Sequence, residues 1–136
     1  MIIADTSGLL VFFNVDEPAH DVVERAVMTE NDALVVSAAV VTELDYLVST
    51  RYGVSVELSV LHELAGGAFD IAWLEQHELV TATEVIERYA DQRIGLADAS
   101  LVVLAARHRT RRILTLDRRH FEVLRPLDGG RFRLVP

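Results

Sequence analysis

Short apolar runs alternate along this chain with longer segments of helical periodicity, and this alternation is the strongest constraint on its fold. Strands are expected at residues 2–4, 34–36, 69–74 and 113–116, with a terminal strand at 132–135. Segments of helical periodicity lie between most of them. Parallel strands need long crossover connections, and these connections are right-handed. The pattern therefore predicts an α/β fold with a short, mostly parallel sheet flanked by helices on both faces.

Several helix boundaries are marked by residues that favour helix ends. Pro18 suits the first turn of the second helix. Ser37 is expected to cap a helix that ends near Gly53, and Ser55 is expected to cap the helix after it. These signals predict that two helices follow the second strand directly.

The composition narrows the class of protein. At 136 residues the chain is expected to form a single domain, residues 1–136. The absence of cysteine excludes disulfides and thiolate metal sites, and leaves oxygen and imidazole as metal ligands. No apolar run reaches the about 18 residues of a membrane-spanning helix, and the first residues lack the features of a signal peptide. A cytoplasmic protein without membrane association is expected.

The charge is unevenly distributed. The net charge is −8, which argues against a protein that coats nucleic acid non-specifically. All thirteen cationic residues are arginine, and several lie between residues 107 and 119. Arg112, Arg118 and Arg119 are candidate contacts to the phosphates of a nucleic acid, because a planar guanidinium group can bind two phosphate oxygens at once. The alternative is a solvated helix end whose cations suit the helix dipole.

Four acidic residues lie within or beside apolar runs, where a carboxylate is unfavourable unless it has a partner. Taken singly, each has an ordinary explanation. Asp5 can cap a helix, and Glu43 can face solvent. Asp98 can interact favourably with the dipole at the start of a helix, and Asp117 can lie in a turn. No single one of these four acids is a specific signal.

Together the four acids predict a site. In a parallel sheet, ligands bind outside the carboxyl ends of the strands, and both Asp5 and Asp117 follow strands. Glu43 lies beside the buried stripe of its helix, and no lysine is available to neutralise the group. Mutual repulsion would raise the pKa values of converging carboxylates unless a cation neutralises them. The expected cofactor is Mg²⁺, for which Mn²⁺ can substitute, and the expected chemistry is metal-assisted phosphodiester hydrolysis.

Neighbouring residues are candidates for accessory roles. Thr6, Ser7 and Thr115 are placed to hydrogen-bond metal-bound water or phosphate, or else to serve as capping and strand hydroxyls. Asp91 is a candidate fifth, outer carboxylate, or else caps a helix end. His120 is interpreted as a surface residue rather than a base. Trp73 and Tyr46 are interpreted as packing residues rather than as platforms for the stacking of nucleic-acid bases.

Four motifs in order resemble the PIN-domain ribonucleases, specifically the VapC toxins of bacterial toxin–antitoxin pairs. They are Ile2-Ile3-Ala4-Asp5-Thr6-Ser7, Val40-Val41-Thr42-Glu43-Leu44, Gly95-Leu96-Ala97-Asp98-Ala99 and Ile113-Leu114-Thr115-Leu116-Asp117. The resemblance covers essentially the whole chain. It implies the three-layer sandwich of that family, a short parallel sheet between layers of helices.

The resemblance also implies roles and partners. Asp5, Glu43, Asp98 and Asp117 would be the acidic quartet that holds the metal, with Asp5 and Asp98 the principal ligands. The activity would be cleavage of structured RNA, either transfer RNA or ribosomal RNA, restrained by a cognate VapB antitoxin. The family further implies a homodimer and a toxin–antitoxin hetero-oligomer that binds DNA only through the antitoxin.

Two other functions are compatible with an α/β chain of this size. In a receiver-like domain one carboxylate would be phosphorylated, but the chain has no lysine to contact an acyl phosphate. A non-catalytic binding module would keep the fold as an interaction surface, and would fail to bind Mn²⁺. A metal-dependent endoribonuclease is the leading interpretation.

Overall fold

The fold is described from a computed structural model, in residues 1–31 and 33–136. The strands of its sheet are β1 Ile3–Ala4, β2 Leu34–Ser37, β3 Phe69–Ala72, β4 Arg112–Leu114 and β5 Arg133–Val135. They follow the order β3-β2-β1-β4-β5, and every neighbouring pair is parallel. The expectation of a mostly parallel sheet is confirmed, and the sheet is parallel throughout.

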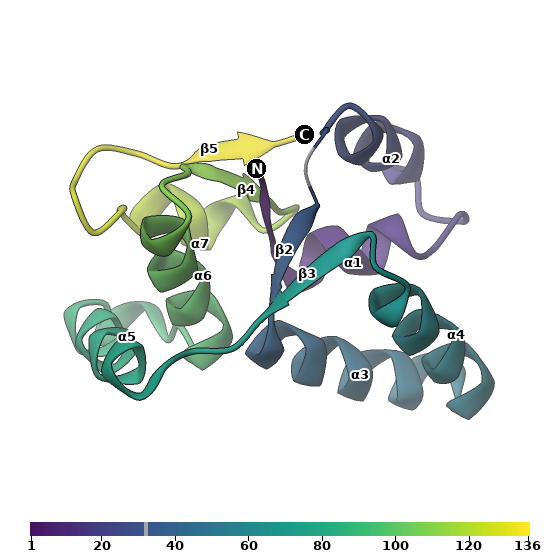
Figure 1. Cartoon of the computed structure of the whole chain (residues 1–136), viewed down its shortest axis with the longest axis horizontal. Coiled ribbons are helices and arrows are strands. Elements are labelled where there is room, and N and C mark those ends of the chain that lie inside the picture. Colours follow the sequence, from purple (N-terminus) through teal and green to yellow (C-terminus); the bar gives the residue numbers. More distant parts are fainter. Residues whose placement is uncertain (32) are drawn as a thin grey trace.

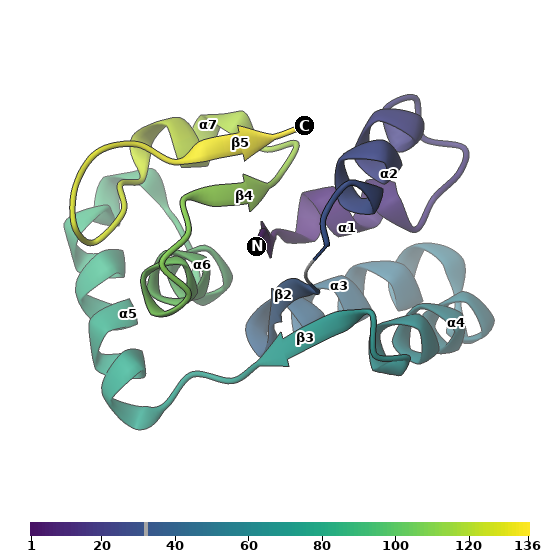
Figure 2. The same ribbon diagram turned by 45° about the horizontal axis from the view of Figure 1, so that its top comes forward.

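Two groups of helices enclose this sheet. The helices are α1 Thr6–Phe12, α2 His20–Met28, α3 Ala38–Tyr52, α4 Val54–Ala65, α5 Gln76–Arg88, the 3₁₀ turn η1 Ala90–Gln92, α6 Leu96–Arg107 and α7 Arg118–Val123. Figure 1 shows α1 to α4 together on one side of the strands and α5 to α7 on the other, and Figure 2 shows the same division from another direction. No helix in the described ranges is long and apolar enough to cross a membrane.

The central strands and α6 form the middle of the core. Ile2, Ile3 and Ala4 are fully buried, and α6 is buried continuously from Ala99 to Ala105. A helix that is apolar all round is an interior helix rather than an amphipathic surface one. The burial of α6 fixes its first turn at the carboxyl edge of the sheet, beside β1 and β2, which it contacts.

Helix α1 approaches β4 unusually closely through Gly8. A Cβ atom at this position would lie 2.7 Å from both Cγ and the carbonyl oxygen of Leu114. No side chain fits there without moving the helix or the strand. The glycine therefore sets the distance between the start of α1 and the end of β4.

Most predicted boundaries agree with the structure to within two or three residues, but two helix starts were assigned wrongly. Pro18 precedes α2, which begins at His20, and does not lie in its first turn. Ser37 caps α3 as expected, because its Oγ accepts a hydrogen bond from the Ala39 amide at 3.2 Å, and Gly53 ends that helix. The expectation that Ser55 caps α4 is wrong. Gly53, at φ 87°, ends α3 and precedes Val54 directly, so Ser55 lies inside α4. Glycine alone reverses the chain without an intervening loop.

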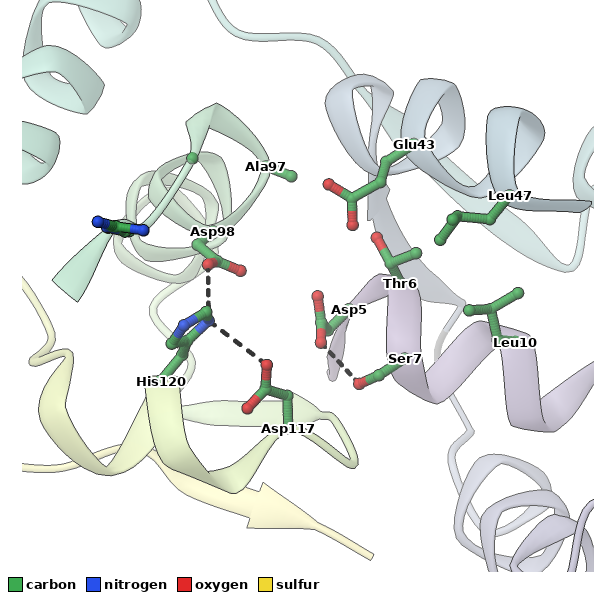
Figure 3. Close-up of a pocket in the computed structure, with 12 residues that line it drawn as sticks. Asp5, Thr6, Ser7, Leu10, Glu43, Leu47, Ala97, Asp98, Asp117 and His120 are labelled. Carbon is green, nitrogen blue, oxygen red and sulfur yellow. Dashed lines mark hydrogen bonds and ion pairs between the residues drawn. The ribbon is translucent and has the colours of Figure 1, made fainter. Parts of the chain in front are cut away.

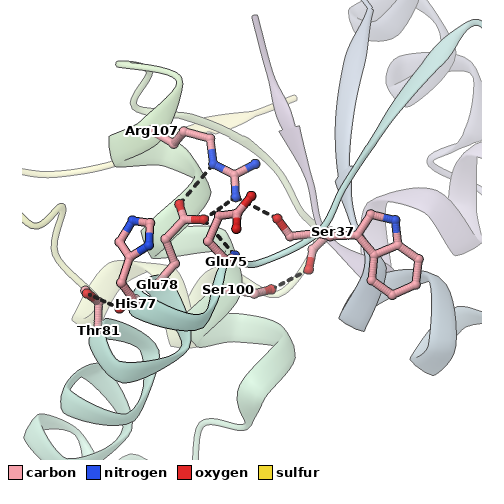
Figure 4. Close-up of polar contacts among 8 residues, drawn as sticks. Ser37, Glu75, His77, Glu78, Thr81, Ser100 and Arg107 are labelled. Atoms are coloured by element: carbon pink, nitrogen blue, oxygen red, sulfur yellow. Dashed lines mark hydrogen bonds and ion pairs between the residues drawn. The ribbon is translucent and has the colours of Figure 1, made fainter.

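An ion pair between a buried glutamate and a partly exposed arginine joins α5 to α6 (Figure 4). Arg107 Nε donates to Glu78 Oε2 at 2.9 Å, and Arg107 Nη2 donates to the other carboxylate oxygen and to the Trp73 carbonyl. The hydrogen bond from the Arg107 guanidinium holds the pKa of Glu78 below its usual value, against the effect of burial. Both carboxylate oxygens of the buried Glu78 are therefore paired with Arg107.

Candidate active site

The four predicted acids converge on one pocket. It has a volume of about 320 Å³ and lies at the carboxyl edge of the sheet, where Asp5, Glu43, Asp98 and Asp117 all line it (Figure 3). Asp5 follows β1, Glu43 comes from α3, Asp98 from the first turn of α6, and Asp117 directly precedes α7. Four distant segments of the chain therefore contribute one carboxylate each.

Asp5 is the most deeply placed of the four. Its residue is only 6% exposed, and its amide donates to the Leu114 carbonyl at 2.9 Å, which extends the pairing of β1 with β4. The side chain does not cap α1, although Asp5 occupies the N-cap position. The capping interpretation is therefore wrong, and the buried carboxylate is directed to the pocket.

Two hydroxyl groups fix the orientation of this carboxylate. Ser7 Oγ and Thr115 Oγ1 each donate to Asp5 Oδ2 at 2.8 Å. The same two oxygens accept the backbone amides of Leu116 and Asp117, both at 3.0 Å. The hydroxyls thus join Asp5 to the loop that carries Asp117. Oδ1 of Asp5 accepts no hydrogen bond from the described part of the chain, so it is free for a ligand.

Asp98 lies opposite Asp5 and next to a histidine. His120 Nδ1 is 3.1 Å from Asp98 Oδ2 and 3.4 Å from Asp117 Oδ2, as the dashed lines in Figure 3 mark. Burial, and then the negative charge of Asp5, raise the pKa of Asp98 to about 6, and Glu43 and Asp117 add to the rise while His120 opposes it. The raised pKa is the electrostatic signature expected of carboxylates brought together without a cation.

Glu43 and Asp117 form the open side of the pocket. Glu43 is exposed, and the Asp117 side chain is 39% exposed, whereas the Asp98 side chain is only 17% exposed. The interpretation of Glu43 as a solvated helix residue is therefore correct for its exposure but incomplete, because Figure 3 shows its carboxylate turned toward Asp5. The pocket has a buried floor and an acidic mouth.

A buried pair of serines connects the two helices that carry Glu43 and Asp98. Ser100 Oγ lies 2.7 Å from Ser37 Oγ and 2.6 Å from the carbonyl oxygen of Ala97 (Figure 4). Ser37 caps α3, and Ser100 is in the turn of α6 that follows Asp98. Both serines are essentially inaccessible to solvent. The pair fixes the start of α3 against the start of α6.

Thr6 provides a further polar atom at the pocket. It is 4% exposed and lines the pocket, and its Oγ1 is buried with no hydrogen-bond partner among the described residues. Buried polar atoms without partners are rare in proteins and destabilise them. A water molecule or a phosphate oxygen in the pocket would satisfy this hydroxyl.

Apart from Thr115, which bonds to Asp5 without lining the pocket, four predicted residues are not brought to it. Asp91 is exposed in η1, where it accepts a hydrogen bond from Gln92, and it does not line the pocket. Arg112 lies at the amino end of β4, whereas the pocket lies at the carboxyl end of the sheet. Its side chain forms an ion pair with Glu30. Arg118 and Arg119 are exposed on α7 and also lie outside the lining. Their proximity in sequence to Asp117 did not place them in the site.

Two pocket residues with ionisable side chains were missed. His120, interpreted as a surface residue, lines the pocket because its position three residues after Asp117 returns it to the same side of the first turn of α7. Arg93 also lines the pocket, from the turn between η1 and α6. The helical spacing from Asp117 is a signal that would have found His120. No periodicity marks Arg93.

The donor set fits a divalent cation. Carboxylate and hydroxyl oxygens without thiolates are the ligands that suit Mg²⁺ and Mn²⁺, and the raised pKa of Asp98 and the free Thr6 hydroxyl both indicate a missing polar partner. In the described ranges no three acidic or histidine side chains are already close enough to enclose an ion. The carboxylates of Asp5, Glu43, Asp98 and Asp117 line the pocket and are the residues that would hold the cation.

Trp73 and Tyr46 differ from the packing role expected of them. Trp73 is 75% exposed and Tyr46 is 67% exposed. Trp73 lines another pocket, which is shallow and apolar, together with Leu74, Leu79 and Leu96. Leu96 directly precedes the residues Ala97 and Asp98 of the acidic pocket. Residue type alone predicts burial, but these aromatic side chains lie on the surface of a single chain.

Comparison with known proteins identifies the family. The model of the PIN domain matches residues 2–125. Ribonuclease VapC26 of Mycobacterium tuberculosis (strain ATCC 25618 / H37Rv) is 56% identical over 135 residues, which make up 99% of this chain and 100% of the relative. The sequence match extends over both the strand ends and the helices that carry the four acids.

Two solved structures have the same fold at low sequence identity. VapC20 of Mycobacterium tuberculosis, a sarcin-ricin loop cleaving toxin, has a TM-score of 0.84 at 15% identity, with 100% of each chain covered. The DNA-bound VapBC of Salmonella typhimurium has a TM-score of 0.71 at 16% identity, with 98% of each chain covered. The chain therefore belongs to the PIN-domain family and, within it, to the VapC ribonucleases.

Proposed function

We propose that this protein is the toxin of a VapBC-type toxin–antitoxin pair, and that it hydrolyses phosphodiester bonds in structured RNA with Mg²⁺ or Mn²⁺. The convergence of four carboxylates on one pocket is the observation that carries the proposal. The 56% identity to a ribonuclease over the full length supports RNA as the substrate. Transfer RNA and ribosomal RNA are the substrate classes proposed.

Asp5 and Asp98 are the proposed principal metal ligands, with Glu43 and Asp117 completing the site. When bound, the metal supplies Lewis-acid activation of water and neutralises the charge on the phosphate. Asp5 presents Oδ1 because Ser7 and Thr115 occupy Oδ2. Such anchoring holds a ligand in a defined orientation and lowers the entropic cost of binding.

The polar residues in and beside the pocket are proposed to orient the carboxylates and the bound substrate. Thr6 offers its unpartnered hydroxyl to a water or a phosphate oxygen. Ser7 and Thr115 keep the loop before α7, and with it Asp117, in register with Asp5. His120 holds Asp98 and Asp117 near each other through Nδ1. Electrostatic preorganisation of this kind is where most of the catalytic effect of such a site arises.

Substitution of the acids tests the activity. Asp5→Asn and Asp98→Asn should each abolish RNA cleavage and growth inhibition, because each removes a metal ligand. Asp91→Asn is the matched control, since Asp91 is a nearby aspartate outside the pocket. Mapping RNA 5′ ends after brief induction in cells, and cleavage of the same RNA by purified protein with and without EDTA, are the measurements. Cleavage retained by Asp98→Asn, or in EDTA, would contradict the proposal.

A cognate VapB antitoxin is the proposed inhibitor. The fold is similar to that of a chain of the DNA-bound VapBC, which supports a toxin–antitoxin hetero-oligomer. The proposed contact of that assembly with DNA is through the antitoxin. Coexpression of the protein encoded beside this gene should restore growth and copurify with the chain. Failure to copurify, or growth inhibition that persists on coexpression, would argue against a dedicated antitoxin.

A homodimer is the proposed oligomeric state. Trp73, Leu79 and Leu96 are exposed around the shallow apolar pocket, and exposed apolar surface of this kind is typical of protein contacts. Arg107 is already engaged with Glu78 and the Trp73 carbonyl, so the surface has little free positive charge for RNA. Sedimentation should find a dimer for the wild type and a monomer for Trp73→Arg. A wild-type monomer would contradict the proposal.

A further inference from the structure

Arg93 is the one arginine among the described residues that line the acidic pocket. It lies in the turn that joins η1 to α6, five residues before Asp98. The arginines expected from the sequence to contact RNA, Arg112, Arg118 and Arg119, all lie outside the lining. A single cation therefore accompanies four carboxylates at the site.

The backbone of Arg93 is held in an unfavourable conformation. Its φ of 52° and ψ of 39° are in the left-handed region, which is unfavourable for a residue with a Cβ atom. Glycine, asparagine and aspartate are the usual residues there. An arginine kept in this conformation beside a pocket is a reason to look for a function of its side chain.

The guanidinium of Arg93 has no partner within the described ranges. The side chain is exposed and forms no hydrogen bond or ion pair there. Arg107 shows what a structural arginine in this fold looks like, because it is fully engaged by Glu78 and the Trp73 carbonyl. Arg93 therefore does not serve as a fixed counter-charge for the carboxylates, although four of them line the same pocket.

An RNA substrate adds negative charge to a site that is already acidic. One divalent ion offsets two of the four carboxylate charges, and a phosphodiester brings a further negative charge. A guanidinium at the mouth reduces this repulsion and binds two phosphate oxygens at once. Building on the proposed ribonuclease function, we infer that Arg93 binds the RNA backbone phosphate at the mouth of the pocket and docks the strand against the carboxylates.

Arg109 provides a matched control within the same chain. It too has a φ of 52° and is exposed, and its side chain has no hydrogen bond or ion pair among the described residues. It differs in place, because it lines a separate cavity at the other end of α6 and not the acidic pocket. Replacement by glycine removes the same side chain and relieves the same backbone conformation at both positions. The two variants differ only in whether an arginine is lost from the pocket.

The probe is a synthetic RNA hairpin that carries the strongest cut site mapped for the wild-type protein in total cellular RNA. Steady-state cleavage with Mg²⁺ is measured over a range of salt concentrations for wild type, Arg93→Gly, Arg93→Lys and Arg109→Gly. Arg93→Gly should raise KM about tenfold with little change in kcat, and should lower the slope of log KM against log salt by about 0.7 to 1. Arg93→Lys should restore the salt slope but only part of the affinity, because it returns the charge and not the paired donors.

The controls separate docking from folding. Arg109→Gly should match the wild type in KM and in salt slope, and both glycine variants should raise the thermal unfolding midpoint. Equal KM and salt slope for Arg93→Gly and Arg109→Gly would overturn the inference, as would a loss of neutralisation by the antitoxin with RNA cleavage intact. Absence of any metal-dependent cut by the wild type would instead refute the proposed function itself, and the inference with it.

Discussion

Two largely buried acids on neighbouring helices have pKa values that are shifted in opposite directions. Glu78 of α5 is joined to Arg107 of α6, which lowers its pKa. Asp98, at the other end of α6, faces three further carboxylates, and its pKa is raised to about 6. Both are acids removed from water, yet only one has a full partner. Glu78, which has a partner, stabilises the structure. Asp98, which lacks a full partner, lowers the stability of the protein but remains available to bind a ligand.

The largest expected effect is on activity. Asp98→Asn should lower RNA cleavage by at least about a thousandfold, because it removes a metal ligand at the pocket. Glu78→Gln should leave cleavage close to the wild-type rate, since Glu78 lies outside the pocket lining. The measurement is the initial rate on the mapped RNA hairpin at a temperature where both variants are folded. A comparable loss in both variants would remove the distinction between the two acids.

Loss of the Glu78 charge should have the largest effect on stability. Glu78→Gln should lower the free energy of unfolding by about 1–3 kcal/mol, because the buried residue 78 would lose its charge-assisted hydrogen bonds to Arg107, whose own side chain is partly exposed. Urea unfolding followed by circular dichroism measures the change. Glu122→Gln is a suitable control, as Glu122 is exposed and its side chain has no ion pair among the described residues. Equal stability of the two variants would show that the ion pair contributes little.

Asp98→Asn should instead stabilise the metal-free protein at neutral pH. The rise in pKa from 3.8 to about 6 corresponds to an upper limit of about 3 kcal/mol, and partial exposure to solvent reduces the expected gain to about 1–2 kcal/mol. The folded state holds its proton more tightly, so wild-type stability should fall as pH rises from about 4 to about 6. Thermal unfolding in EDTA across this range measures the fall, which Asp98→Asn should reduce. An identical pH profile for the variant would contradict the prediction.

The pH response of Glu78 should have the opposite sign. Because its folded pKa is lowered, the stability it contributes is present above about 4.5, the ordinary value for glutamate, and is lost as pH falls through the folded pKa. Glu78→Gln should therefore be most damaging at neutral pH, and its difference from wild type should shrink in acid. The same unfolding series tests this. A difference that is constant with pH would show that charge is not its source.

The smallest effect is expected at the serine pair that fixes α3 against α6. Ser100→Ala should lower the free energy of unfolding by about 1 kcal/mol and lower cleavage several-fold, because Ser37 loses a buried partner and the spacing of Glu43 and Asp98 loosens. Thr83→Ala is a control that removes a hydroxyl bonded only to its own helix. Equal rates for the two variants would assign the serine pair a purely structural role.

The fold and the acidic quartet could be predicted because they leave local signals. Strands and helices have distinct periodicities, Ser37 and Gly53 mark helix ends by their own chemistry, and Asp5 follows a short apolar strand. Parallel topology then places Asp5 and Asp117 at one edge without knowledge of any contact. Those inferences need only the order of residues along the chain.

What could not be predicted depends on contacts or on backbone angles. The left-handed conformation of Arg93 has no sequence marker, since glycine and asparagine are the residues that normally indicate it. Arg112 lies close to Asp117 in sequence but at the other end of β4, so the strand carries it away from the pocket. Trp73 and Tyr46 belong to residue types that are usually buried, but the described fold leaves both on the surface.

The close contact of Gly8 with Leu114 limits how this protein can be improved or can diverge. Replacing a helical glycine by alanine is a standard way to stabilise a helix, and gains up to about 1 kcal/mol elsewhere. At Gly8 the added methyl group would meet the strand at 2.7 Å and push the start of α1 from the end of β4. Asp5 and Ser7 flank this contact, and their bonds to Thr115 depend on it. We therefore expect variants at Gly8 to be excluded by selection for activity even when the helix itself would tolerate them.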